Sequence, residues 1–155
     1  MIETATFTRP LRALLDEAFG VSTAPHGAFL DRGESGLLGT IATIDAATAI
    51  RSSAGEPTIA AHCAHVQYLL SLFAEYEQGR FPQPDWPASW QYPAPDAAGW
   101  DSLRSDLRAA YAATTGYLDA RTAWPEPAVG AWMMLVAHCS YHVGVIHALR
   151  RTLAA

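Results

Sequence analysis

Apolar side chains recur at intervals of three and four residues along most of this chain, and that spacing limits the fold more than any other feature. It places the apolar side chains on one face of an α-helix, whereas a half-buried strand buries every second residue. Strand-like alternation between turn residues is nearly absent. The sequence therefore predicts an all-α protein, arranged as an antiparallel four-helix bundle with short extra helical turns.

Capping and helix-breaking residues set the expected boundaries of the helices. Thr8 and Thr58 are expected N-caps, and Asp45 is expected to cap a short helical turn. Gly20 and Gly79 are expected to end the helices that precede them. Three glycines weaken the helical pattern of the second stretch. We expect the long helical stretches over residues 8–19, 28–44, 59–78, 97–120 and 127–155.

One proline-rich segment interrupts the helical pattern. Residues 80–99 hold five of the ten prolines together with Trp86, Trp90 and Tyr92. Because proline lacks a backbone N–H, this density excludes a helix and a central strand. A loop of this length in a compact domain is usually functional or disordered, and the aromatic residues favour a loop pinned against the bundle. We expect it to form the rim or lid of a site, with Trp86 and Trp90 as pocket residues.

Length and composition exclude several classes of protein. The 155 residues suffice for a single domain, which we expect to cover residues 1–155. The net charge is −5 and the ten basic residues, all arginine, are scattered, which argues against a nucleic-acid partner. We find no signal-peptide pattern and no uninterrupted apolar run of ~18 residues, so we expect a cytoplasmic protein without a membrane partner. The two cysteines, Cys63 and Cys139, are expected to be small buried core residues.

The last expected helix carries two histidines on its apolar face. His138 and His142 lie four residues apart and share that face with Leu135 and Leu149. This spacing is how a helix presents two imidazole nitrogens to one metal ion. His147 lies about half a turn away at ~100° per residue, so we expect it on the opposite, wetter face. Tyr141 could bring a hydroxyl near a metal, although packing between helices is the simpler expectation.

The third expected helix contributes two more histidines near its apolar stripe. His62 and His65 lie three residues apart, so both can approach the core. Either could complete a three-histidine set of the kind that catalytic zinc sites use, with one position left open. The alternative is a metal-free bundle in which the histidines are ordinary core residues. A metal is favoured because each buried imidazole without a partner costs ~1–3 kcal/mol, and one shared cation would satisfy all of them.

Two stretches resemble the DinB/YfiT-like superfamily of metalloenzymes. "TIAAHCAHVQYLL", beginning at Thr58, is similar to its motif T-I-x-x-x-x-x-H-hydrophobic, and "AHCSYHVGVIHALRR" is similar to its motif H-x-x-Y-H-x-G-Q-I. The resemblance implies a four-helix bundle with up-down-down-up connectivity. It also implies a divalent cation, zinc or nickel, held by His65, His138 and His142. His62 matches no ligand position and is expected beside the ligands or in the core.

The same resemblance gives the expected activity. Relatives include S-transferases that use low-molecular-weight thiols and a thiol-dependent maleylpyruvate isomerase. It therefore implies a metal-dependent enzyme, a transferase or a related hydrolase or isomerase, that joins a thiol cofactor to a small-molecule substrate, and the family habit suggests a homodimer. Val145 stands where the family often has glutamine, which puts any activity that needs that amide in question. The alternative is a non-catalytic stress-response bundle that binds a metal or an apolar ligand.

Overall fold

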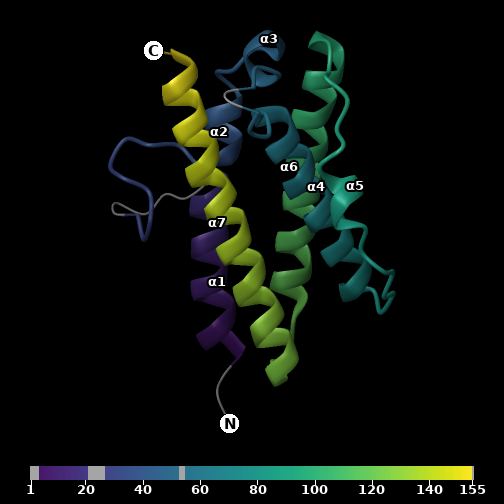
Figure 1. The fold of residues 1–155 in the computed structure, drawn as a ribbon. Coiled ribbons are helices and arrows are strands. Elements are labelled where there is room, and N and C mark those ends of the chain that lie inside the picture. Colours follow the sequence, from purple (N-terminus) through teal and green to yellow (C-terminus); the bar gives the residue numbers. More distant parts are fainter. Residues whose placement is uncertain (1–3, 21–26, 53–54, 155) are drawn as a thin grey trace.

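The computed structural model describes residues 4–20, 27–52 and 55–154, and over these residues the fold is all-helical, as predicted, with no strand. Four helices are long and three are single short turns (Figure 1). In chain order they are α1 (Thr4–Phe19), α2 (Leu37–Ile41), α3 (Ala46–Ala49), α4 (Ile59–Glu77), α5 (Trp86–Ser89), α6 (Ala97–Ala120) and α7 (Glu126–Ala154).

The four long helices pack around one apolar core. α4 packs against α6 and α7, and α1 packs against α7 and α6. Figure 1 shows α1 and α7 running towards one end of the molecule and α4 and α6 running towards the other. The segment between α4 and α6 leads the chain back along the outside of these helices. The largest fully buried side chains come from all four long helices and α2, among them Leu15, Phe19, Leu37, Ile59, Leu70, Trp100, Leu107, Trp132 and Leu135.

Side-chain caps begin the helices α3, α4, α5 and α6. Thr58 accepts a hydrogen bond from the backbone N–H of Ala61 and begins α4, and Asp45 accepts one from Thr48 and begins α3. Both caps were predicted, and each contributes about 1 kcal/mol. Gly79 follows α4 with a φ of 75°, a conformation that glycine adopts without steric cost.

The expected long helix over residues 28–44 is wrong, because only α2 forms there. The Glu17 carboxylate accepts hydrogen bonds of 2.7–2.9 Å from the backbone N–H groups of residues 28, 29 and 30, which fixes that segment in a non-helical path. Gly36 then lies so close to the end of α1 that an added Cβ would sit 2.4 Å from the Glu17 carbonyl oxygen. Glycine is therefore required at this approach.

Two other boundaries differ from the expectation. α1 begins at Thr4, before the expected cap Thr8, because its first turn is anchored to the α6–α7 connection. The Thr4 hydroxyl donates to the carbonyl of Thr122 at 3.0 Å, and the Trp124 indole donates to Thr8 at 3.2 Å. The proline-rich segment also contains one helical turn, α5, where no helix was expected; Asp85 caps it and its proline lies in the first turn, where the missing N–H costs nothing.

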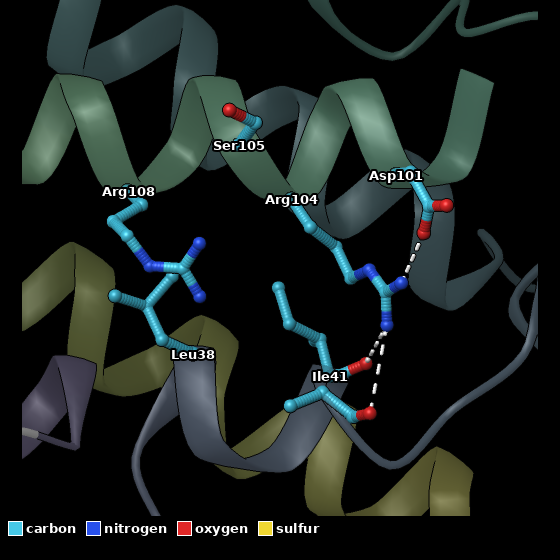
Figure 2. Close-up of a pocket in the computed structure, with 7 residues that line it drawn as sticks. Leu38, Ile41, Asp101, Arg104, Ser105 and Arg108 are labelled. Atoms are coloured by element: carbon cyan, nitrogen blue, oxygen red, sulfur yellow. Dashed lines mark hydrogen bonds and ion pairs between the residues drawn. The ribbon is translucent and has the colours of Figure 1, made fainter. Parts of the chain in front are cut away.

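Arg104 on α6 holds α2 in place. Its guanidinium donates to the carbonyl oxygens of Ile41 and Ala42, at 3.4 and 3.5 Å, at the C-terminal end of α2 (Figure 2). It also pairs with Asp101 one turn earlier on α6. Arg108 lies one further turn along and lines the same small cavity of about 200 Å³. A cation at the C-terminal end of a helix interacts favourably with the carbonyl groups there.

α7 is long and apolar enough, by length and composition, to cross a membrane. Core helices of soluble proteins can have the same length and composition, and here α7 packs against α1 and α4. The expectation of a protein without a membrane partner therefore stays a prediction.

Candidate metal centre

Four histidines come together where α4 packs against α7. α4 supplies His62 and His65, and α7 supplies His138 and His142. His142 is 1%, His65 3% and His62 5% exposed, whereas His138 is half-buried. The inward positions that the helical spacing predicted for these four side chains agree with the packing, so the group has a dry interior and one side nearer to solvent.

Three of the four histidines direct the same ring atom to one point. Nε2 of His138 lies 3.1 Å from Nε2 of His65 and 3.0 Å from Nε2 of His142. One ring nitrogen from each of the three histidines lies within 4.8 Å of those of the other two. This group could hold a metal ion, and it consists of the three histidines predicted as ligands.

No protonation pattern of these three nitrogens satisfies all the contacts. A neutral imidazole Nε2 presents either one N–H or one lone pair in the plane of the ring. If all three carry lone pairs, they repel one another. A single proton on His138 would have to be divided between two acceptors in bent, weak hydrogen bonds. A cation at the common point would accept all three lone pairs, so the donor set fits a metal.

The spacing of the nitrogens fits common metal geometries. With a metal–nitrogen bond of about 2.05 Å, two ligands are about 3.3 Å apart in a tetrahedron and about 2.9 Å apart at a right angle, as in an octahedral face. The contacts of 3.0 and 3.1 Å lie between these values. Small movements of the imidazoles would therefore reach either geometry, and three ligands leave at least one position open.

The other ring nitrogens of two members of this group are also engaged. Nδ1 of His142 lies 2.9 Å from Nδ1 of His62. Nδ1 of His65 lies 2.7 Å from the hydroxyl oxygen of Ser89, which donates its own proton to the carbonyl of Trp86 at 2.6 Å. His62 thus lies beside a predicted ligand, as expected. Sequence reasoning missed Ser89, and nothing in the residues around it distinguishes it from the other serines of the chain.

Aromatic rings from the proline-rich segment cover the histidines. The half-buried Trp90 ring stacks on His65 with 4.0 Å between centroids and 14° between planes, and it meets His62 edge-on at 5.2 Å. Trp86 lies further out, 6.0 Å from His65 and 41% exposed. The segment is thus pinned over the group, as its composition suggested. Tyr141 is 65% exposed, and its ring lies 5.0 Å from that of His142 at 77° between planes, so the expectation that it packs between helices is wrong.

Burial keeps these histidines neutral. It lowers the pKa of His142 to about 3, and the repulsion that a charged His142 would meet from protonated His138, His62 and His65 adds to the effect. Burial likewise lowers the pKa of His65 to about 4, with His138 and His62 adding to the effect. Burial alone lowers the pKa values of His62 and His138. Neutral imidazoles are the form that binds metals, so no proton has to leave before a cation enters at neutral pH.

His147 does not lie on the wet face where it was expected. It is buried between α7 and the chain before α2, and its Nε2 lies 2.9 Å from both the Thr40 hydroxyl and the Ser35 carbonyl oxygen. Glu34 lies 3.6 Å from its Nδ1. The unexpected packing of residues 33–40 against α7 covers this side of the helix, which helical periodicity alone could not show.

The two cysteines do not join the histidine group. Cys63 and Cys139 are buried and free, as predicted. Burial raises the pKa of the Cys139 thiol to about 12 and raises that of Cys63 as well. Both therefore remain protonated thiols in the core and are neither nucleophiles nor ligands at neutral pH.

No protein-family model, curated protein or solved structure matches the chain. The resemblance to the DinB/YfiT-like superfamily therefore stays a prediction, carried by the quoted motifs, and the function must be argued from the histidine group itself.

Proposed function

We propose that the protein is a four-helix bundle of up-down-down-up connectivity that binds one divalent cation through Nε2 of His65, His138 and His142. The observation that carries the proposal is the approach of these three nitrogens, with contacts of 3.0 and 3.1 Å that no arrangement of protons satisfies. Zinc and nickel are the expected cations, because neutral imidazole suits both. The quoted motifs and the directions of the four long helices support the same assignment.

We further propose that the site is catalytic and acts on a low-molecular-weight thiol and a small electrophile. A cation bound by three neutral imidazoles keeps its full charge and favours the anionic form of a thiol at neutral pH. Within the described part of the chain, no carboxylate is hydrogen-bonded to or ion-paired with these three histidines or His62. This favours a reaction whose nucleophile is activated by charge over one that needs a carboxylate as general base.

The surrounding residues have separate tasks in this proposal. His62 contacts the nitrogen of His142 that faces away from the common point and so fixes that ring. Trp90 covers His65 and His62 and excludes water from that side. Half-buried His138 and exposed Tyr141 lie on the more open side, where a small-molecule substrate would enter. A cytoplasmic location and a homodimer, both suggested by the family, complete the proposal.

A non-catalytic metal-binding bundle is the second candidate. It is favoured by the lack of a carboxylate partner for the four histidines among the described residues, and by half-buried Val145. Where related sequences often carry a glutamine that could orient a substrate, this chain offers only hydrocarbon. Turnover separates the two candidates, since both require the cation.

The metal content of protein purified without a nickel column tests the site. We expect about one equivalent of zinc or nickel by mass spectrometry in the wild type and a loss of more than about tenfold in affinity in His142→Ala, because two ligands bind much more weakly than three. His147→Gln is the matched control, since it removes a buried histidine of the same helix outside the group, and it should retain the metal. Absence of metal from the wild type, with no effect of added zinc or nickel on stability, would contradict the proposal.

The catalytic part is tested by supplying a thiol and a small electrophile such as an activated aryl halide or an epoxide. Conjugation that stops with a chelator and returns with the cation would support an enzyme. Full metal occupancy without turnover of any of these pairs would favour the non-catalytic bundle.

A further inference from the structure

The hydroxyl of Ser89 has only one way to contact His65. Its oxygen lies 2.6 Å from the Trp86 carbonyl oxygen, which can only accept, so the hydroxyl proton is used there. Towards Nδ1 of His65, 2.7 Å away, the same oxygen can therefore only accept. The Nδ1 atom must carry the proton, because two lone pairs at this distance would repel each other.

This proton fixes the state of the other nitrogen. A neutral imidazole carries one N–H, so a proton on Nδ1 leaves Nε2 of His65 with a lone pair. That lone pair points to the group formed with His138, 3.1 Å away. The opposite tautomer would place a proton at the point where a cation would bind.

The serine belongs to a segment outside the four long helices, and contacts with α4 hold that segment in place. Ser89 is the last residue of α5. At the start of α5, Asp85 caps the turn and donates its backbone N–H to the Tyr68 hydroxyl on α4 at 2.8 Å. Trp90, the next residue, stacks on His65. Ser89 is 7% exposed, so water has little access with which to replace its hydroxyl.

We infer that Ser89 is a positioning residue, whose hydroxyl holds His65 in the tautomer with an unprotonated Nε2 and thereby couples the docking of residues 80–96 to cation binding. The inference rests on the proposed function for the cation, but the tautomer itself is a property of the metal-free protein. Coupling is reciprocal: if the docked segment raises the affinity for a cation, the cation must stabilise the docked segment by the same factor.

The experiment measures the imidazole ¹⁵N shifts of His65 in metal-free protein, together with zinc affinity by competition with a chromophoric chelator. In the wild type we expect a proton on Nδ1. In Ser89→Ala we expect a mixture of tautomers or a proton on Nε2, and an affinity lower by about 10–100-fold, the usual loss when the partner of a ligand is removed. Ser89→Thr keeps the hydroxyl and should recover the tautomer and most of the affinity. Ser71→Ala, which removes an exposed hydroxyl on the same helix as His65, is the control and should change neither.

The two proposals fail in different ways. Wild-type protein that shows the Nδ1 proton but binds no zinc or nickel would overturn the proposed metal site and leave the role of Ser89 in setting the tautomer intact. A proton on Nε2 in the wild type would overturn the inference, whatever the metal content. An unchanged tautomer in Ser89→Ala would overturn it as well, even if the affinity fell, because the serine would then act only through the shape of the segment.

Discussion

The metal-free protein should lose stability as the pH falls from 6.5 to 5. Burial lowers the pKa of His142 to about 3 and that of His65 to about 4, whereas an unfolded histidine titrates near 6.5. Below pH 6.5 the unfolded chain therefore binds protons that the folded chain does not. The stabilisation is complete above the unfolded pKa and is lost as the pH falls towards the folded values.

The size of the effect follows from the number of protons. Each proton bound only by the unfolded chain costs about 1.4 kcal/mol of unfolding free energy per pH unit, so 1.5 pH units cost about 2 kcal/mol per histidine. His65 and His142 are 3% and 1% exposed, so solvent does little to reduce this loss. Together they give about 4 kcal/mol at pH 5, a large share of the 5–15 kcal/mol typical of a domain.

Urea unfolding in the presence of a chelator, followed by circular dichroism at pH 7, 6 and 5, measures this loss. His142→Gln removes one of these two groups and should reduce the loss between pH 7 and 5 by about 2 kcal/mol. The buried carboxylate Glu17, whose pKa is lowered by its backbone hydrogen bonds although burial opposes them, destabilises the fold only at still lower pH. An unfolding free energy that stays constant between pH 6.5 and 5 would refute the assignment of neutral, buried imidazoles.

Three further predictions test separate parts of the structure. Nickel should quench tryptophan fluorescence on binding, and Trp90→Phe should remove the largest share of the quenching, because Trp90 stacks 4.0 Å from a proposed ligand; equal quenching in the variant would contradict this. Glu17→Gln should lower the unfolding free energy at pH 7, measured by urea unfolding, by about 2 kcal/mol, because an amide cannot accept from three backbone N–H groups as a carboxylate does. A change below about 0.5 kcal/mol would contradict this role of the Glu17 carboxylate. Cys63 and Cys139 should not react with a thiol reagent at pH 8 until the protein is denatured, because both are buried thiols of raised pKa; rapid reaction in the native state would show that the core is open.

Sequence reasoning succeeded where local signals and the global packing agree. The bounds of α6 were predicted correctly because its apolar residues keep one face along the helix; the cap that Asp96 provides was seen only in the structure. The positions of His138 and His142 followed in the same way, since a rigid helical period decides which residues share a face. For the third histidine the helical spacing allowed either His62 or His65, and the resemblance to the family motif, not the spacing, selected His65.

The failures share a cause, which is contact between residues far apart in the chain. The expected helix over residues 28–44 is absent because Glu17 on α1 uses the backbone N–H groups of its first residues. His147 was assigned to solvent because nothing in its own helix shows that residues 33–40 cover it. A single sequence carries no signal for such contacts, and polar ones are the hardest, because one buried carboxylate or hydroxyl has no period.

The site thus combines two kinds of structural control. The helices decide where the three nitrogens lie, because one turn of α7 separates His138 from His142 and the packing of α4 brings His65 to them. They do not decide which of the two nitrogens of His65 carries a proton, because the atom that sets it, the Ser89 oxygen, belongs to the proline-rich segment. The same helices with a different segment would keep the positions and lose control of the proton, so under the two proposals the segment, and not the helices alone, would make His65 a ligand.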